Sequence, residues 1–206
     1  MENEKDNLIR LTKDHIKPAA VTLTNAFINY PVSVYFTPDE AKRKKLQPGI
    51  SRGILRNAIG TGEVYTTSAR MEGIAVWMLT QNQFNAKKQR TSLMAWLKNL
   101  FGDKESQRRH KAFFEYSDSI RKRVLPAKYW YLQMLGVDPA YQGQGFSSRL
   151  VKPMLARAKR EGLPVFLETQ LQKNVALYQH FGFKVVEEGN IPGSNVYSWA
   201  MVKEPK

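Results

Sequence analysis

An apolar run, two closely spaced glycines and an amphipathic segment follow one another in this chain and constrain its fold more than any other feature. The run is Tyr129–Val137, and the predicted helix opens at about Phe146 and continues to about Glu161. Gly143 and Gly145 let the backbone come close to a ligand, because no side chain stands in the way. The helix turns its unpaired N–H groups and the positive end of its dipole toward this loop. The stretch therefore predicts a pyrophosphate site, with a plain strand-to-helix turn as the alternative.

The loop differs from two familiar phosphate-binding loops. It lacks the Gly-Lys-Ser/Thr ending with which nucleoside-triphosphatases reach the terminal phosphates and magnesium. It is closer to a dinucleotide fingerprint, because Gly143, Gly145 and Ser148 are spaced as G-x-G-x-x-S. Glu168 also ends the next predicted strand, where that fold places a ribose acceptor. Residues 138–142 nevertheless separate the strand from the first glycine, and few parallel units follow, which argues against a doubly wound sheet. Side-chain donors beside the glycines come from Gln142, Ser147 and Ser148.

The whole chain has the length and composition of a single domain spanning residues 1–206. No apolar run approaches the roughly 18 residues that a membrane span needs, and the first residues are too charged for a secretory signal. We therefore expect a cytoplasmic protein with no membrane partner. The absence of cysteine excludes a disulfide framework, a thiolate zinc site and a cysteine nucleophile. His15, His110 and His180 lie far apart, so their spacing predicts no metal site.

A net charge of +14 points to polyanions among the partners. A nucleic acid, an anionic membrane surface and a multiply phosphorylated cofactor all have the required chemistry. The basic clusters lie at 42–45, 87–90, 108–111 and 121–123, outside the glycine loop. Solvated helix faces explain each cluster without a partner, so the charge alone selects no ligand.

Strands and helices are expected to alternate along the chain in the order of a mixed α/β protein, with largely antiparallel pairing. The expected strands are 7–11, 64–68, 73–79, 129–137, 164–169, 183–187 and 195–202. The expected helices are 18–29, 40–59 and 146–161, a helical insertion at about 84–126, and a short helix at 174–181. Asn174 is a natural cap for that short helix, because its side chain can accept a hydrogen bond from an unpaired amide.

The C-terminal half resembles a known family. The motifs are Val137-Asp-Pro, Gln142-Gly-Gln-Gly145-Phe-Ser, and Asn174-Val-Ala-Leu-Tyr-Gln-His-Phe-Gly-Phe183. Together they resemble the GNAT superfamily of acyl-coenzyme A N-acyltransferases. Within it, Trp130-Tyr-Leu, Phe166-Leu-Glu-Thr169 and 177–183 are similar to puromycin N-acetyltransferase-like members. The resemblance implies a mostly antiparallel twisted sheet with helices on both faces and a splayed strand pair. Ser147 departs mildly from the glycine or alanine of many members.

The resemblance also implies an activity. An acetyl group would pass directly from acetyl-CoA to the primary amine of a small molecule, such as an aminonucleoside or antibiotic-like amine, without a covalent enzyme intermediate. A protein N-acetyltransferase, or an acyl-CoA-fold binding protein acting on a ribosomal or nucleic-acid-associated partner, is the alternative. A monomer or a homodimer is expected.

Site residues follow from the same resemblance. Backbone amides of Leu135, Gly136 and Val137 would bind the thioester carbonyl and the pantetheine arm. The pyrophosphate would lie against the loop residues Gln142, Gly143, Gln144, Gly145, Phe146, Ser147 and Ser148.

The catalytic candidates lie after the loop. Tyr178 is the candidate general acid, because a phenol is protonated at neutral pH and can donate to a departing thiolate; the buried face of a short helix is the alternative. Glu168 is the candidate general base, directly or through water, since Tyr129–Val137 contains no acid; an ordinary strand-end carboxylate is the alternative. Asn174 would either bind the pantetheine or substrate or serve only as a helix cap. The acceptor pocket is expected around Phe27, Tyr30 and Tyr35 of the first helices, together with the insertion.

Overall fold

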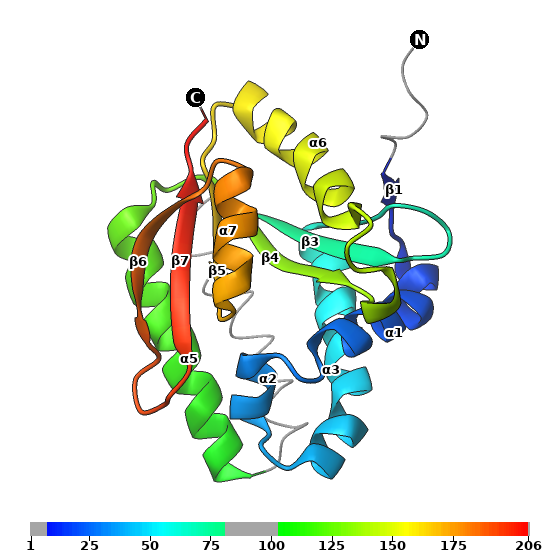
Figure 1. The fold of residues 1–206 in the computed structure, drawn as a ribbon, viewed down its shortest axis with the longest axis vertical. Coiled ribbons are helices and arrows are strands. Elements are labelled where there is room, and N and C mark those ends of the chain that lie inside the picture. Colours follow the sequence, from blue (N-terminus) through cyan, green and yellow to red (C-terminus); the bar gives the residue numbers. More distant parts are fainter. Residues whose placement is uncertain (1–7, 81–102, 206) are drawn as a thin grey trace.

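The fold is built on one mixed sheet. The structure, a computed structural model, describes residues 8–80 and 103–205. In this part of the chain the strand order is β1-β2-β3-β4-β5-β7-β6. The strands are β1 (Ile9–Arg10), β2 (Glu63–Thr66), β3 (Gly73–Thr80), β4 (Tyr129–Val137), β5 (Val165–Thr169), β6 (Lys184–Asn190) and β7 (Tyr197–Lys203). Every neighbouring pair is antiparallel except β4 and β5. The predicted mixed α/β class with a mostly antiparallel sheet is confirmed (Figure 1).

Helices connect these strands. They are α1 (Ile16–Phe27), α2 (Pro31–Phe36), α3 (Glu40–Thr61), α5 (Lys104–Val124), α6 (Phe146–Arg160) and α7 (Gln172–His180), with short 3-10 turns at Lys13–His15 and Pro139–Tyr141. Aspartate side chains cap two of them: Asp39 accepts from the backbone N–H of Lys42, and Asp103 accepts from that of Ser106. The sequence analysis missed the short helix α2, which begins at the proline that ends the preceding segment. No helix in the described ranges is both long and apolar enough to cross a membrane.

Alternating side chains of the strands divide the core between the two faces of the sheet. On β3, Ala75 and Trp77 belong to the cluster with α6 and α7, whereas Ile74 and Val76 belong to the cluster with α1 and α3. Side chains of a strand alternate between faces, so the two clusters lie on opposite sides. Ile120 of α5 packs against side chains of β4, β5 and β7, on the same face of the sheet as α1 and α3. Helices therefore cover both faces, as the family resemblance implied.

Strand β4 is irregular at Gln133 and separates from β5 soon after it begins. Leu132 pairs with Trp77 and Met134 pairs with Val76, so Gln133 is an extra residue with no partner on β3. The bulge also shifts the alternation, because Leu132 packs on the α6 side and Met134 on the α1 side. The parallel pairing of β4 with β5 is limited to Trp130–Val165 and Tyr131–Phe166. The expected splayed pair is present, and it opens beside the bulge.

The expected helical insertion at about 84–126 is described only in its second part. There α5 packs against the sheet beside β7 (Figure 1). The patch around Leu93, Trp96, Leu97 and Leu100 lies outside the described residues.

Candidate active site

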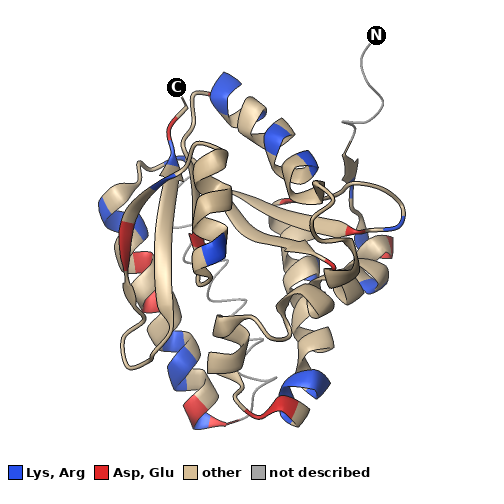
Figure 2. Cartoon of the chain, viewed as in Figure 1, with Lys and Arg blue, Asp and Glu red and all other residues tan. Residues whose placement is uncertain are grey.

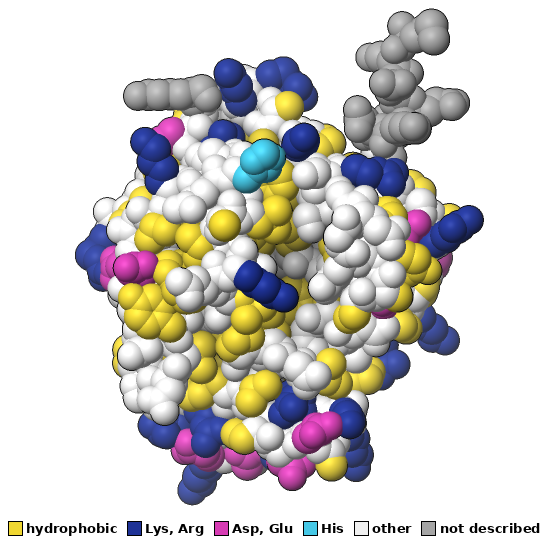
Figure 3. Space-filling view, viewed as in Figure 1, with side chains coloured by type: hydrophobic (Ala, Val, Ile, Leu, Met, Phe, Trp, Pro, Cys, Tyr) yellow, Lys and Arg dark blue, Asp and Glu magenta, His cyan; other side chains and the backbone are white. Residues whose placement is uncertain are grey.

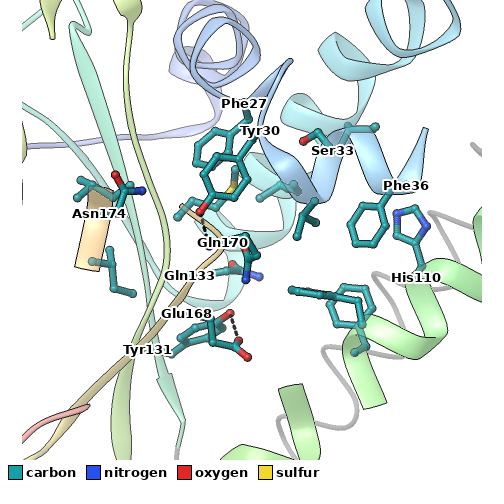
Figure 4. Close-up of a pocket in the computed structure, with 18 of the residues that line it drawn as sticks. Phe27, Tyr30, Ser33, Phe36, His110, Tyr131, Gln133, Glu168, Gln170 and Asn174 are labelled. Carbon is teal, nitrogen blue, oxygen red and sulfur yellow. Dashed lines mark hydrogen bonds between the residues drawn. The ribbon is translucent and has the colours of Figure 1, made fainter. Parts of the chain in front are cut away.

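A pocket of about 190 Å³ opens where β4 and β5 separate. Asn174 and Tyr178 reach it from α7 on one face of the sheet, and α2 and α5 reach it from the other. Tyr131 and Gln133 of β4 and Glu168 of β5 lie between these groups (Figure 4). In the space-filling view, hydrophobic side chains gather around a hollow near the centre of the face (Figure 3). The pocket thus connects the two faces of the sheet.

The carboxylate of Glu168 is hydrogen-bonded through one oxygen, and the other is unpaired among the described residues. Its Oε2 accepts a 2.6 Å hydrogen bond from the Ser117 hydroxyl of α5 and a 3.3 Å bond from the Tyr131 hydroxyl, drawn in Figure 4. Its Oε1 is buried and has no partner among the described residues. Burial, and next the charge of Glu168, raise the pKa of the Tyr131 phenol, which therefore stays a donor. A buried, oriented carboxylate oxygen at a pocket can accept a proton or an N–H group.

Tyr178 projects from α7 into the same pocket. Its ring packs edge-on against Phe183, with centroids 5.9 Å apart, and the side chain is buried. Burial, and next the neighbouring phenol of Tyr30, raise the pKa of Tyr178. The hydroxyl therefore carries its proton at neutral pH, and none of the described residues engages it in a hydrogen bond. A protonated phenol beside a pocket can donate to a leaving group.

Tyr30 ties the end of helix α1 to the end of strand β5. Its hydroxyl lies 3.0 Å from the Thr169 hydroxyl and accepts a 3.0 Å bond from the backbone N–H of Gln170. Phe27 packs edge-on against its ring, with centroids 5.2 Å apart. Both aromatic rings line the pocket, as the sequence predicted. The expected contribution of Tyr35 is wrong: Phe36 lines the pocket instead, and the Tyr35 ring lies against the Arg109 guanidinium.

The capping role expected for Asn174 is also wrong. Helix α7 begins at Gln172 with Leu171 as its N-cap, so Asn174 already lies inside the first turn. Its backbone N–H donates to the carbonyl of Leu171, because the chain turns into the helix almost directly from β5. The Asn174 amide instead donates to the Thr169 hydroxyl at 3.2 Å and lines the pocket beside Tyr178. A polar role in the pocket is therefore open to it.

The glycine loop has the open backbone that its sequence predicted. Gly143 and Gly145 have φ angles of 78° and 80°, a region that favours glycine, and a Cβ at either position would meet nothing within 4 Å. Gly145 is the N-cap of α6, and no side chain caps that helix. The amide of Gln142 donates to the carbonyl of Val137, and that of Gln144 donates to the carbonyl of Ala140. These two side chains hold the loop, and the first backbone N–H groups of α6 have no partner within the helix and no side-chain cap, which is the arrangement that suits an anion.

The segment Leu135–Val137 lies where the sheet has opened. Leu135 lines the pocket, and β4 has no partner on the β5 side beyond Tyr131. A Cβ on Gly136 would come within 2.8 Å of the Phe27 ring, so glycine is required for α1 to pack this closely. Leu135–Val137 therefore lies along the chain between the pocket and the glycine loop.

Several pocket residues escaped the sequence analysis. His110 and Phe113 line the pocket from the insertion, and Ser117 of the same helix donates to Glu168 beside it. None of the three was assigned a role in the site from the sequence. Gln133 did carry a signal, because it is the one polar side chain in the run from Tyr129 to Val137 apart from the tyrosine hydroxyls. In residues 8–80 and 103–205, no cluster of three or more His, Asp or Glu side chains is placed to hold a metal ion.

Comparison with known proteins identifies the family. Residues 91–183 match the Acetyltransferase (GNAT) family. An uncharacterized N-acetyltransferase of Schizosaccharomyces pombe is 30% identical over 202 residues, covering 94% of this chain and 81% of the relative. Arylalkylamine N-acetyltransferase 2 from Aedes aegypti has a similar fold, with a TM-score of 0.72 at 13% identity over 97% of this chain and 99% of that one. The Corynebacterium glutamicum structure described as histone acetyltransferase HPA2 and related acetyltransferase gives a TM-score of 0.66 at 20% identity, over 97% and 96%.

An opened, mostly antiparallel sheet with a glycine loop beside the opening defines an acetyltransferase class of fold. With the sequence match and the Schizosaccharomyces pombe relative, the chain belongs to the GNAT family of acetyltransferases. It is a GNAT-type N-acetyltransferase, and that family generally uses acetyl-CoA as the acetyl donor.

Proposed function

We propose that this enzyme transfers the acetyl group of acetyl-CoA directly to the primary amine of a small molecule. The observation that carries the proposal is the pocket at the splay, which is lined by both Tyr178, with its protonated phenol, and Glu168, with one unpaired carboxylate oxygen. A transfer between an amine and a thioester needs one group that accepts a proton and one that donates it. Both are present without a cysteine, so a direct transfer requires nothing further from the chain.

The coenzyme would bind along the opened edge of β4. The backbone N–H groups at Gly143, Gly145 and the start of α6 would hold the pyrophosphate, with the hydroxyls of Ser147 and Ser148 beside them. The other loop residues in this site are Gln142, Gln144 and Phe146. Backbone amides of Leu135, Gly136 and Val137 would bind the pantetheine arm and polarise the thioester carbonyl. The Asn174 amide faces the same pocket and is placed to bind the pantetheine or the substrate.

In the transfer, the amine nitrogen attacks the thioester carbonyl carbon and the carbon–sulfur bond breaks. Glu168 accepts the proton that the amine loses, directly or through one water, because its Oε1 is otherwise unpaired. Tyr178 donates its proton to the departing sulfur, so coenzyme A leaves as a thiol. Ser117 and Tyr131 are positioning residues, because they hold the carboxylate.

The acceptor is an open choice between two kinds of molecule. The Aedes aegypti protein is by its name an arylalkylamine N-acetyltransferase, which favours a small amine. The Corynebacterium glutamicum structure is described as histone acetyltransferase HPA2 and related acetyltransferase, which favours a protein acceptor. The net charge of +14 is the feature of this chain that favours a ribosomal or nucleic-acid-associated partner. Lys and Arg are distributed over α3, α5, α6 and α7 (Figure 2), and none of the residues labelled at the pocket is Lys or Arg (Figure 4).

Three further expectations belong to the same proposal. The motifs within 130–132, 166–169 and 177–183 suggest an aminonucleoside or antibiotic-like amine, by their similarity to puromycin N-acetyltransferase-like members. The protein would act in the cytoplasm as a monomer or homodimer. Residues 1–206 would form a single domain in which the helical insertion supplies one wall of the pocket.

The test is the release of free thiol from acetyl-CoA with a panel of small amines, aminonucleosides and peptides. Turnover with small amines supports the proposal. Turnover with peptides alone would indicate that the enzyme is a protein acetyltransferase instead. No turnover with any acceptor, together with salt-sensitive RNA binding, would favour a nucleic-acid-binding role.

A further inference from the structure

Gln133 has a buried polar group that the protein does not satisfy. Its Oε1 is inaccessible to solvent and has no hydrogen-bond partner among the described residues, although the side chain lines the pocket. Residues 8–80 and 103–205 contain few such atoms, and two of them, on Gln133 and Glu168, lie in this one pocket. An unpaired buried acceptor is costly, so each of these atoms calls for a partner, which a ligand or a bound water supplies. Both oxygens require a hydrogen-bond donor.

The bulge in β4 gives Gln133 its position. A regular strand would place residue 133 opposite a residue of β3, within the alternation of the two core faces. As the extra residue of the bulge, Gln133 instead directs its side chain toward Glu168 and the open space between the strands (Figure 4). The backbone irregularity and the unpaired amide thus occur at one residue.

Aromatic side chains form the wall that faces these two acceptors. Phe36 packs edge-on against Phe113, with centroids 5.5 Å apart, and Phe113 against Phe114 at 5.4 Å. His110 stacks on Phe36 with centroids 3.7 Å apart, and its burial keeps the ring neutral at physiological pH. Phe27 completes this apolar wall. Such a surface favours a flat apolar group, which can add further edge-on contacts.

The volume of the pocket and the charges that line it further limit which ligands can bind. A cavity of about 150 Å³ can hold benzene, so a pocket of about 190 Å³ that also receives the thioester end of acetyl-CoA has room for one aromatic ring with a short arm and no more. Of the described residues that line the pocket, Glu168 is the one carboxylate. A second positive charge on the ligand would therefore lie among phenylalanine rings without a counter-charge, which is unfavourable.

We infer that the acceptor is a primary monoamine attached to an aryl group, and that Gln133 is a specificity-determining residue that accepts a hydrogen bond from its amine end. This inference rests on the proposed function and names its substrate class. The aryl group lies against Phe36 and Phe113, and the amine end points to Glu168 and Gln133. Diamines and polyamines are excluded, because the described residues that line the pocket offer no second carboxylate.

The first test compares two amines of similar reach with the full chain and acetyl-CoA. The value of kcat/KM for 2-phenylethylamine is expected to exceed that for 1,5-diaminopentane by roughly tenfold or more, since burying an unpaired charge is costly. Equal or better turnover of the diamine overturns the substrate class. If neither is acetylated but an aminonucleoside or a peptide is, the inference fails while acetyl transfer stands. If no acceptor is used and acetyl-CoA does not bind, the proposed function itself fails.

The second test separates binding from folding at Gln133. Gln133→Leu is expected to raise the KM for 2-phenylethylamine roughly tenfold and to leave the KM for acetyl-CoA unchanged. Its Tm is expected to stay the same or to rise, because the substitution removes an unpaired buried acceptor. Gln170→Leu is the matched control, because Gln170 lines the same pocket but its amide donates to the Ser198 hydroxyl at 2.9 Å. That control is expected to lower Tm and change the amine KM less. A Gln133→Leu protein with a lower Tm and an unchanged amine KM would assign Gln133 a structural role and overturn the inference.

Discussion

The Ser117 hydroxyl donates a 2.6 Å hydrogen bond to Glu168 Oε2 and thereby joins helix α5 to strand β5. The bond occupies one carboxylate oxygen, and the other, Oε1, is buried without a hydrogen-bond partner among the described residues. A free carboxylate at a strand end would rotate between several orientations. The helical insertion therefore contributes more than a wall, because it orients the residue proposed to accept the proton.

Ser117→Ala should slow acetyl transfer without weakening acetyl-CoA binding. A hydrogen bond to a charged group is worth about 1.5–3 kcal/mol, so kcat is expected to fall roughly tenfold, allowing for the remaining bond from Tyr131. Steady-state kinetics with calorimetric acetyl-CoA binding measure the two effects. Ser119→Ala is the control, because the Ser119 hydroxyl on the same helix donates to the carbonyl of Tyr116, away from Glu168. An equal loss of kcat in both variants would attribute the effect to the helix rather than to the carboxylate.

Tyr178→Phe should lower kcat much more than it changes the Kd for acetyl-CoA. Loss of a general acid typically costs about 100-fold or more in rate, whereas the ring contact with Phe183 is kept. Tm should hold, since none of the described residues loses a hydrogen bond to the Tyr178 hydroxyl. Tyr197→Phe, at an exposed position, serves as the control and should retain full activity. Unchanged turnover in Tyr178→Phe removes the acid assignment.

Gly145→Val should abolish acetyl-CoA binding while the protein stays folded. A branched side chain at a φ of 80° costs about 1–2 kcal/mol, and its bulk would occupy the space where the backbone meets the pyrophosphate. Gly162→Val is the matched control at the other end of α6, because its φ is 66° and a Cβ there also meets nothing within 4 Å. Both variants should lose similar stability in urea titrations, and only Gly145→Val should lose calorimetric binding. Unaltered affinity in Gly145→Val would refute the loop assignment.

The sequence predicted a helix or strand correctly where the signals that define it lie within the element or directly beside it. The run Tyr129–Val137 and the helix start at Phe146 were placed to the residue, because apolar periodicity and the glycine loop bound them on both sides. Helix α2 was missed, since six residues are too few to show a period. Asn174 was misread as a cap because its side chain suits that role, although the chain enters α7 at Gln172.

The candidate site was predictable only where it follows a motif. Glu168, Tyr178 and the glycine loop could be named, because strand order and family motifs mark them. Ser117 and His110 could not be named from the sequence. Their roles depend on how α5 packs against β5 and α2, and these contacts join residues that lie far apart in the sequence. Gln133 was visible as a polar residue in an apolar run, but its meaning depends on a bulge that only strand pairing reveals.

His110 should make the stability of the protein depend on pH in mildly acidic solution. Burial is the main cause that lowers its pKa from 6.5 to about 4, and the hydrogen bond to the carbonyl of Ser106 opposes this only in part. Between these two pH values the unfolded chain binds a proton at His110 that the folded chain does not. This contribution to the free energy of unfolding is therefore complete above about pH 6.5 and is lost as the pH falls toward 4. The loss amounts to about 1.4 kcal/mol per pH unit. Urea unfolding between pH 4 and 7 gives the free energy of unfolding as a function of pH. This free energy should change less steeply with pH in His110→Gln than in the wild type, whereas His180→Gln, at an exposed position, should retain the wild-type pH dependence. A wild-type slope in His110→Gln would mean that another group accounts for the acid sensitivity.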